Sequence, residues 1–370
     1  MSFARAGMSL GLSTAIRLGA GLAAIKLVVL FTGASGLGQL GILISALAVL
    51  SAVAGGGVAN GVITRIAQAR PLGQPVGPVL GTAVSIGLAW SLLLALGLLA
   101  VPERAASMLL DDPGRAWLMR WLAVGQLGMN CAALIGGYLS GRQLFGQFSA
   151  LSIIGSVIGM TGVAVGAWWR GVDGALLGLV WLNGCTGLVM AAWVAIALPR
   201  QALREFAPAW SAPEARRLLK YSLMLVVSAL TLPLTQLFLQ QLLYRNAGWD
   251  GVGYWQAVTK YSDAALQFLT VVLANYYLPR LAEADGHAKL LGVMREAFRY
   301  ALPVLALFAA LSVALVKPLI LLLYNESLLP ATTLMPWQVL GAVLKMLSYV
   351  IGYVVVAKGK AGLYIAAEIL

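Results

Sequence analysis

The sequence is poor in charged residues, which make up 10% of its 370 positions, whereas about 25% is usual in soluble domains. Hydrophobic residues reach 61%, and the mean hydropathy is +0.89. A soluble globular fold is excluded, because so few charged residues cannot keep such an apolar chain in water. The composition indicates an integral membrane protein.

Residues that hold metals or form disulfides are also scarce. Cys131 and Cys185 lie within apolar runs, and no C-x-x-C spacing occurs. The only histidine, His287, stands in a charged loop, where a solvated position and a pH-sensing role are both open. No P-loop pattern is present, and the pair Asp111 and Asp112 sits in a short loop near arginines, which is typical of a solvated loop. We expect no metal, no cofactor and no enzymatic activity.

Long apolar runs dominate the chain. Each has roughly 18 to 25 residues, the length of a helix that crosses a bilayer, whereas outer-membrane barrels show short alternating segments. The first run continues to Phe31, which favours an uncleaved first span over a signal peptide. We predict an all-α polytopic membrane protein with spans over residues 8–31, 39–62, 78–100, 116–139, 147–169, 173–198, 218–243, 253–278, 299–316 and 334–357.

Lysine and arginine are unequally distributed between the loops on the two sides. Of the 25 basic residues, fifteen fall in loops on the side of the N-terminus and six in loops on the other side. Because basic loops stay in the cytoplasm, the N-terminus is predicted to be cytoplasmic. The net charge of +12 then reflects topology and attraction to anionic lipid. No nucleic-acid partner is predicted.

Two segments of the chain, residues 36–69 and 251–284, align without a gap at an offset of 215. The matched pairs are Gly36 and Gly251, Gly38 and Gly253, Ala59 and Ala274, Asn60 and Asn275, Arg65 and Arg280, and Ala67 and Ala282. Gly137 and Tyr138 fall on Gly352 and Tyr353 at the same offset. A register kept at both ends of a lobe indicates a tandem duplication.

The longest polar connection, residues 199–220, divides the predicted halves. We predict a first lobe of six spans over residues 1–198, a cytoplasmic inter-lobe loop over 199–217, and a second lobe over 218–370. Six spans before the loop give both lobes the same orientation, a pseudo-twofold parallel repeat. The second lobe would hold spans seven to ten and the start of an eleventh. If it matched the first lobe, roughly fifty residues would be missing after it.

Five charged side chains remain inside predicted spans: Arg17, Lys26, Lys260, Asp263 and Lys345. Each costs about 2.5–3.5 kcal/mol at mid-helix unless it faces water or a partner. Arg17 and Lys345 lie too deep to reach the interface, so they predict a polar cavity. Lys26 and Lys260 lie near a helix end and can instead extend to the headgroups. Asp263 either pairs with Lys260 at the i, i+3 spacing or binds a coupling ion.

Polar side chains accompany these charges on the same helix faces. In the eighth span Gln256, Lys260, Asp263 and Gln267 form one stripe. Similar stripes follow the seventh and tenth spans, through Pro233, Gln236 and Gln240 and through Lys345, Tyr349 and Gly352. Hydrogen bonding between helices is the alternative explanation, above all in the seventh span. With four cations against one anion, the predicted cavity favours a negatively charged solute.

Several segments carry a resemblance to a known family. They are GYWQAVTKYSDAALQF (253–268), NYYLPRLAE (275–283), PWQVLGAVLKMLSYVIGYVVVAKG (336–359), AGGGVANGVITRIAQ (54–68) and GALLGL (174–179). The chain resembles the Wzx-type polysaccharide flippases of the multidrug/oligosaccharidyl-lipid/polysaccharide exporter superfamily, and among them the lipid III flippases of enterobacterial common antigen. The resemblance covers the whole chain, although no single motif is catalytic.

This resemblance implies two six-helix lobes around a central cavity that opens alternately to cytoplasm and periplasm, in the bacterial inner membrane. The substrate would be a short oligosaccharide on undecaprenyl pyrophosphate, with glycan polymerase and chain-length machinery as further partners. Cationic side chains suit the diphosphate, whose oxygens accept charge-assisted hydrogen bonds. The substrate-binding candidates are Arg17, Lys26, Lys260, Lys345, Gln256, Gln267, Asn60 and Asn275. Asp263 is the candidate for coupling to a proton or sodium ion.

Two other functions remain open. A multidrug exporter of the same superfamily would carry cationic drugs, which an excess of basic residues disfavours. A membrane-embedded glycan polymerase or ligase would need a large outer loop with acid and base residues, and the outer loops here are short.

Overall fold

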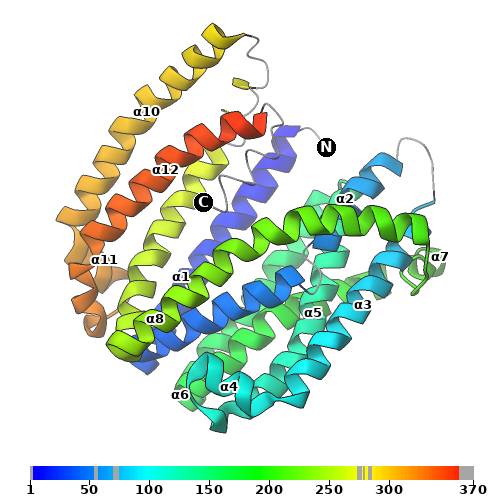
Figure 1. The fold of residues 1–370 in the computed structure, drawn as a ribbon, viewed down its shortest axis with the longest axis horizontal. Helices are drawn as coiled ribbons and strands as arrows, with labels where there is room; N and C mark the ends of the chain where they lie inside the picture. The colour runs from blue at the N-terminus through cyan, green and yellow to red at the C-terminus, as the bar shows by residue number, and fades with distance from the viewer. Residues whose placement is uncertain are drawn as a thin grey trace. The chain divides into compact units, whose positions relative to one another are not determined.

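A computed structural model of the chain describes residues 3–53, 57–69, 75–272, 277, 280–281 and 286–357. Within these residues the secondary structure is helical and contains no strand (Figure 1). The predicted all-α class is therefore confirmed. The helices up to residue 272 are α1 (Phe3–Ser51), α2 (Gly57–Ala69), α3 (Gly77–Ala100), α4 (Pro102–Leu110), η2 (Pro113–Arg115), α5 (Ala116–Gly141), α6 (Phe145–Ala197), α7 (Arg200–Arg204) and α8 (Ala212–Val272). After them come α10 (His287–Ala314), α11 (Val316–Leu323), η4 (Glu326–Thr333) and α12 (Met335–Ala357).

The chain divides into two compact units by its internal contacts. Unit 1 comprises Met1–Thr32 and Gln39–Asn246, and unit 2 comprises Gly33–Gly38 and Ala247–Leu370. Both α1 and α8 therefore contribute residues to each unit. The lobes predicted over 1–198 and 218–370 stay a prediction.

Three glycines with positive φ interrupt the longest helices. α1, α6 and α8 have 49, 53 and 61 residues, far more than the roughly 20 that cross a bilayer. Gly33, Gly171 and Gly248 have φ angles of 68°, 58° and 65°, which glycine tolerates because it lacks a Cβ. They lie between predicted spans one and two, five and six, and seven and eight. Each long helix is thus two predicted spans joined at a glycine.

Elements of the two halves recur in the same order. Gly248 follows Gly33 by 215 residues (248 − 33), and their ψ angles, −172° and −162°, are also similar. The succession α3, α4, η2 and α5 is followed by α10, α11, η4 and α12, so each half has a long helix, a short helix, a 3-10 turn and another long helix. This order is what the proposed duplication predicts, and the repeat itself stays a prediction.

Small residues set the closest helix crossings in unit 1. At Gly187 of α6, an added Cβ would collide with the backbone of Gly128 in α5. Without side chains at the crossing the two backbones approach directly, as in membrane helix pairs generally. Beside this crossing, a buried cluster that includes Val62, Leu80 and Leu139 joins α2, α3 and α5. α5 is therefore the central helix of unit 1.

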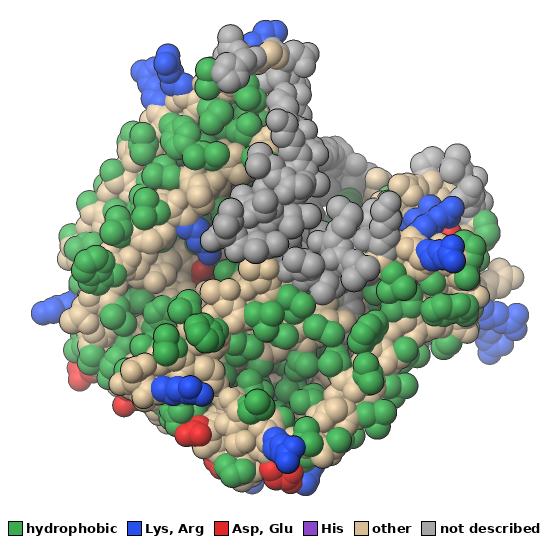
Figure 2. Space-filling model, in the orientation of Figure 1, with side chains coloured by type: hydrophobic (Ala, Val, Ile, Leu, Met, Phe, Trp, Pro, Cys, Tyr) green, Lys and Arg blue, Asp and Glu red, His purple; other side chains and the backbone are tan. Residues whose placement is uncertain are grey.

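Large apolar side chains remain on the outside of the helices. Leu92, Leu93 and Leu96 of α3 and Val304 and Leu307 of α10 are all exposed. Figure 2 shows hydrophobic side chains spread over much of the visible face. Six helices in the described part of the chain have the length and hydropathy needed to cross a membrane. Apolar surface on this scale indicates contact with lipid.

Candidate functional site

A cavity of about 370 Å³ lies within unit 1, between α2, α5, α6 and the end of α1. Its polar lining consists of five hydroxyl side chains, Ser51, Ser140, Ser152, Ser156 and Thr186. The larger apolar lining residues are Ile63, Met129, Phe148 and Met190. None of the residues that line it has an ionisable side chain. We call it the hydroxyl cavity, because it is polar without being charged.

The helical break at Gly171 places both halves of α6 around the hydroxyl cavity. Ser152 and Ser156 lie four residues apart in the first half, so they share one face of the helix. Thr186 belongs to the second half, which packs so closely that a Cβ on Gly155 would lie 2.6 Å from the Cα of Thr186. Hydroxyl groups distant in the sequence therefore converge on one space.

Four of these five hydroxyl groups have no hydrogen-bond partner among the described residues. Thr186 Oγ1 donates a hydrogen bond to the Leu182 carbonyl at 3.2 Å. Ser152 is only 6% exposed, and for Ser51, Ser140, Ser152 and Ser156 the described part of the chain offers no side-chain hydrogen bond. Buried polar groups are normally hydrogen-bonded. These donors and acceptors are therefore available to water or to a solute in the cavity.

Unit 2 carries the predicted stripe of the eighth span. On α8, Gln256 is buried, Lys260 and Asp263 are half-buried, and Gln267 is exposed. Among the described residues, Lys260 and Asp263 form no ion pair with each other or with a third group. The structural pairing considered for Asp263 is therefore not present in this structure. A half-buried charge without a partner is poised to bind an ion or solute.

Two hydroxyl contacts fix this part of α8 within unit 2. Tyr261 Oη lies 2.7 Å from Ser312 Oγ on α10, and Tyr324 Oη, after α11, donates to the Ala257 carbonyl at 2.9 Å. These contacts flank Lys260 along the helix. They hold the stripe on a rigid element, as a binding group requires.

Lys345 lies on α12, which belongs to the same unit. Its side chain is half-buried, and in the described part of the chain it makes no ion pair. Leu266 of α8, Leu305 of α10 and Met346 of α12 form one buried cluster. The residue next to Lys345 thus packs with the helix that carries Lys260 and Asp263. Unit 2 gathers these three charges on helices that share a core.

Of the remaining predicted residues, the structure describes the side chains of Lys26 and Asn60 only. Lys26 is half-buried on α1 and already has an interaction partner, and Asn60 is exposed on α2. The Arg17 side chain and the whole of Asn275 lie outside the described residues. None of the predicted residues with a described side chain lines the hydroxyl cavity.

The polar stripe of the seventh span makes a bond between helices. Gln240 is buried, and its Nε2 donates to Ser45 Oγ at 2.9 Å. Nearby, Gln241 Nε2 donates to the Met108 carbonyl at 2.9 Å. For Gln240 the alternative of hydrogen bonding between helices is the one observed.

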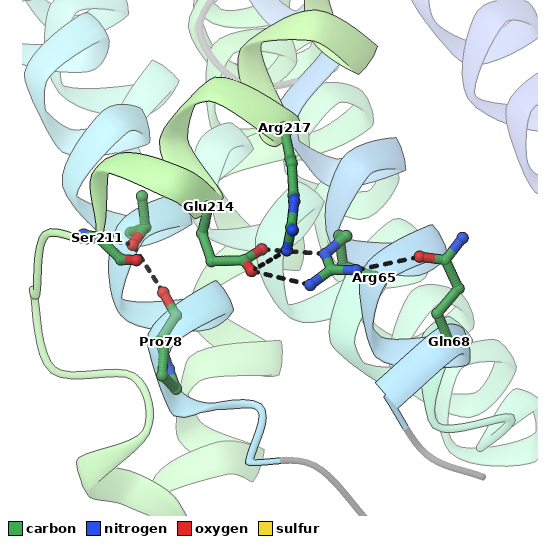
Figure 3. Close-up of polar contacts among 7 residues, drawn as sticks. Arg65, Gln68, Pro78, Ser211, Glu214 and Arg217 are labelled. Carbon is green, nitrogen blue, oxygen red and sulfur yellow. Dashed lines mark hydrogen bonds and ion pairs between the residues drawn. The ribbon is translucent and has the colours of Figure 1, made fainter. Parts of the chain in front are cut away.

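A polar cluster joins the end of α2 to the start of α8 (Figure 3). Arg65 contacts both carboxylate oxygens of Glu214, through Nη2 at 2.8 Å and Nε at 3.0 Å. Arg217 Nη1 donates to the same carboxylate at 2.9 Å. The hydrogen bond from Arg65 and the charges of both arginines hold the pKa of Glu214 below its ordinary value, although burial acts in the opposite direction. This cluster anchors the first residues of α8 to unit 1.

Sequence reasoning missed the hydroxyl cavity. The spacing of Ser149, Ser152 and Ser156 is helical and could have marked one polar face of α6. Serine is nevertheless common at contacts between membrane helices, so the pattern alone does not distinguish a contact from a cavity.

Full-length relatives identify the kind of protein that this chain resembles. The chain is 32% identical over 371 residues to the lipid III flippase of Escherichia coli (strain K12), covering 100% of the chain and 88% of that protein. The lipid III flippase of Shigella flexneri matches with the same identity and coverage. No family model matches the chain.

Solved transporter structures share the fold. An inward-facing multidrug resistance MATE family transporter of the MOP superfamily aligns with a TM-score of 0.69, 18% identity, and coverage of 96% of this chain and 81% of its own. An outward-facing conformation of such a transporter aligns with a TM-score of 0.68 and 15% identity, covering 98% of this chain and 84% of its own. A third structure is a MOP superfamily transporter from Pyrococcus furiosus, described by the reverse polarity of its binding pocket. It aligns with a TM-score of 0.63 and 14% identity, covering 99% of this chain and 84% of its own. At these identities the likeness shows the fold alone.

Proposed function

The chain belongs to the family of lipid III flippases, and we propose that it moves an undecaprenyl-pyrophosphate-linked oligosaccharide from the cytoplasmic to the periplasmic leaflet of the inner membrane. The observation that carries this proposal is the 32% identity over the full length of the chain. The fold of MOP superfamily transporters supports it. The chain is a membrane protein with transporter architecture and not an enzyme.

The diphosphate of the substrate is assigned to basic residues. Lys260 and Lys345 lie half-buried in unit 2, where the described residues give them no ion-pair partner. Arg17 and Lys26 of α1 would add to the positive charge. Each charge disfavours membrane insertion by about 2.5–3.5 kcal/mol at mid-helix. Binding of phosphate oxygens through charge-assisted hydrogen bonds gives that cost a function.

The other predicted polar residues have supporting positions. Gln256 and Gln267 lie on the same stripe as Lys260, and we assign them to hydrogen bonds with the polar head of the substrate. Asn60 and Asn275 occupy equivalent positions at the 215 offset. The prenyl tail stays in lipid while the head crosses, which avoids moving a long apolar chain through water.

Asp263 is assigned to ion coupling. It is half-buried, and in the described part of the chain it forms no ion pair, even with Lys260 one helical turn away. A carboxylate in this setting can take up a proton or a sodium ion and lose it again as its surroundings change. We propose that its occupancy drives the change between cytoplasm-facing and periplasm-facing states.

Alternating access is supported by the glycine breaks. Gly33 and Gly248 lie at the boundaries between unit 1 and unit 2, and solved relatives of the fold are described as inward-facing and as outward-facing. The excess of basic residues in loops on the N-terminal side supports a cytoplasmic N-terminus. Glycan polymerase and chain-length machinery would act on the translocated product.

A multidrug exporter is the second candidate, because solved multidrug transporters share the fold. It would require acidic residues for cationic drugs, whereas the charges inside the predicted spans are four cations and one anion. A glycan polymerase or ligase has no comparable support. The fold evidence alone does not separate the two transport functions.

Complementation of a cell that lacks its lipid III flippase tests the proposal. At native expression the chain should restore surface glycan, and Arg17→Ala or Lys345→Ala should each abolish the restoration. Lys317→Ala, on the short helix α11, is the matched control and should behave as the parent chain. If the chain restored no glycan but raised drug resistance in the same strain, multidrug export would replace lipid flipping as its proposed function. Normal surface glycan with both the Arg17→Ala and the Lys345→Ala variant would contradict the assignment of the diphosphate to basic residues.

A further inference from the structure

We propose that the hydroxyl cavity of unit 1 is a subsite for the uncharged sugar rings of the lipid-linked oligosaccharide. The proposal rests on the flippase function and adds to it a place for the glycan. Of the basic residues proposed for the diphosphate, none with a described side chain lines this cavity. The two parts of one polar head would thus bind chemically different surfaces.

The uncharged, hydroxyl-bearing lining disfavours charged ligands and purely apolar ligands. A drug cation or a phosphate would find no counter-charge among the described residues that line the cavity, because none of them is ionisable, and an isolated charge in such a site is costly. A prenyl chain would leave the four serine hydroxyl groups without partners, since Thr186 alone already bonds to the Leu182 carbonyl. A neutral solute rich in hydroxyl groups meets both conditions, because it exchanges hydrogen bonds with serine and threonine without a net charge.

The free hydroxyl groups supply the specific contacts. Ser152 is almost fully buried, and Ser51, Ser140 and Ser156 flank the same space. Their side chains have no hydrogen bond within the described part of the chain. Each hydroxyl can donate one hydrogen bond and accept others, as can each hydroxyl of a sugar. A ligand that satisfied them would be distinguished from one that did not.

The apolar lining suits the faces of sugar rings. Phe148 lies against α5, where a Cβ on Gly136 would come within 3.0 Å of its ring. An aromatic ring held in this way offers a flat surface for the C–H face of a pyranose. Met129 and Met190 provide adaptable contacts beside it. Apolar and aromatic walls with a few placed polar groups are the usual composition of a small-molecule site.

The volume of the cavity limits what it can hold. At about 370 Å³ it is near the lower end of the roughly 300–1,000 Å³ found for small-molecule sites. It would therefore hold part of an oligosaccharide and leave the remaining sugars and the diphosphate outside. This predicts that the cavity contributes to affinity for the glycan and not to affinity for the carrier lipid.

Binding to two lipids tests the subsite with the full chain in nanodiscs. The probes are undecaprenyl pyrophosphate and the same lipid carrying its oligosaccharide. Ser152→Ala combined with Ser156→Ala should weaken binding of the glycan-bearing lipid about tenfold, at roughly one hydrogen bond for each hydroxyl. Binding of undecaprenyl pyrophosphate should not change. Ala133→Leu, which fills the cavity, should have at least as large an effect on the glycan-bearing lipid.

A pair of threonines on α6 provides the matched control. Thr186 and Thr161 each donate to the carbonyl four residues earlier, but only Thr186 lines the cavity. Thr186→Val should weaken glycan binding about fivefold, and Thr161→Val should leave it unchanged. A melting temperature for each variant separates lost binding from lost folding.

Each remaining result has one meaning. If the cavity variants lost affinity for both lipids equally, the cavity would bind the carrier lipid, and the proposal of a sugar subsite would be wrong. Unchanged binding of both lipids in all the cavity variants would make it a water-filled space only, with the flippase function intact. If the parent chain bound neither lipid, the flippase function itself would fail, whatever the variants did.

Discussion

The two units of the molecule contain related sequences of elements but opposite chemistry. The described lining of the cavity in unit 1 has hydroxyl groups and no charge, whereas unit 2 holds the half-buried charges Lys260, Asp263 and Lys345. The shared order of helices indicates a common scaffold. Under the proposed function, the two halves would bind different parts of the same substrate.

The predicted 215 offset allows the two halves to be compared residue by residue. Lys260 and Asp263 align with Ser45 and Ala48 (260 − 215 and 263 − 215), and Lys345 aligns with Asn130 (345 − 215). Ser45 is buried and accepts a hydrogen bond from Gln240, and Asn130 is 4% exposed. In unit 1 all three positions are neutral, and Ser45 and Asn130 are buried, so the proposed common scaffold does not require the charges of unit 2.

The largest effect is expected from Lys345. Lys345→Ala should weaken binding of undecaprenyl pyrophosphate about 10- to 100-fold, because hydrogen bonds to charged groups contribute roughly 1.5–3 kcal/mol. Asn130→Ala, at the equivalent position of unit 1, should lower the melting temperature without changing that affinity. Equal losses of affinity in both variants would contradict the assignment of the diphosphate to unit 2.

Asp263 is expected to separate binding from coupling. Asp263→Asn should bind the lipid-linked oligosaccharide normally but lose the response of transport to an imposed proton or sodium gradient, since the neutral amide cannot exchange an ion. Transport into proteoliposomes with and without each gradient measures this. Ala48→Ser, at the aligned position of unit 1, serves as the control. A gradient response retained by Asp263→Asn would exclude this carboxylate as the coupling group.

The glycine breaks should respond alike in the two halves. Gly33→Ala and Gly248→Ala should each cost about 1–3 kcal/mol, because their φ and ψ angles are accessible to glycine almost alone. A Cβ at either position meets no atom within 4 Å, so the cost is conformational and not steric. Gly97→Ala, inside α3, is the control and should be neutral or stabilising. Thermal unfolding measures all three, and a large difference between Gly33→Ala and Gly248→Ala would count against equivalent breaks.

A smaller effect is expected at Glu214. Glu214→Gln should cost about 1 kcal/mol at neutral pH by weakening the bonds to Arg65 and Arg217. Because these partners lower the pKa of Glu214 in the folded state, its contribution is present at neutral pH and is lost as the pH falls through that lowered value. The difference in melting temperature between parent and variant should therefore vanish in acid. A constant difference would indicate a cause other than the charge.

The smallest effect is expected at the equivalent arginine of unit 2. Arg280 donates to Glu296 at 2.8 Å, and both side chains are 39% exposed. Exposed ion pairs contribute little, because solvent screens them. Glu296→Gln should therefore lower the melting temperature less than Glu214→Gln does. The opposite order would show that the ion pair of Arg280, and not that of Arg65, contributes more to stability.

The helices and their breaks could be predicted from the sequence, because both depend on local properties. Long apolar runs form membrane helices wherever they occur, and Gly33, Gly171 and Gly248 mark the ends of predicted spans. The charged residues of α8 and α12 were also recognisable, since charge inside an apolar run is rare. These features need no knowledge of tertiary contacts.

The contacts between helices could not be predicted in the same way. Gln240 could face a cavity or another helix, and only the position of Ser45 decides between them. The hydroxyl cavity requires Ser152 and Thr186 to meet across the break in α6. Arg65 and Glu214 were both recognised as loop residues, but 149 residues separate them. Such pairings depend on packing, which a single sequence does not specify.

Transport in proteoliposomes tests whether the chain flips a lipid-linked oligosaccharide. Undecaprenyl pyrophosphate carrying its oligosaccharide is placed in the outer leaflet together with the purified chain, and a glycosidase that cannot cross the membrane is added later. With the parent chain, we expect the glycan to move inside and become protected from the enzyme with time. With Lys345→Ala, we expect this protection to develop far more slowly. Equal protection in vesicles with the parent chain and in vesicles without protein would contradict the proposed function.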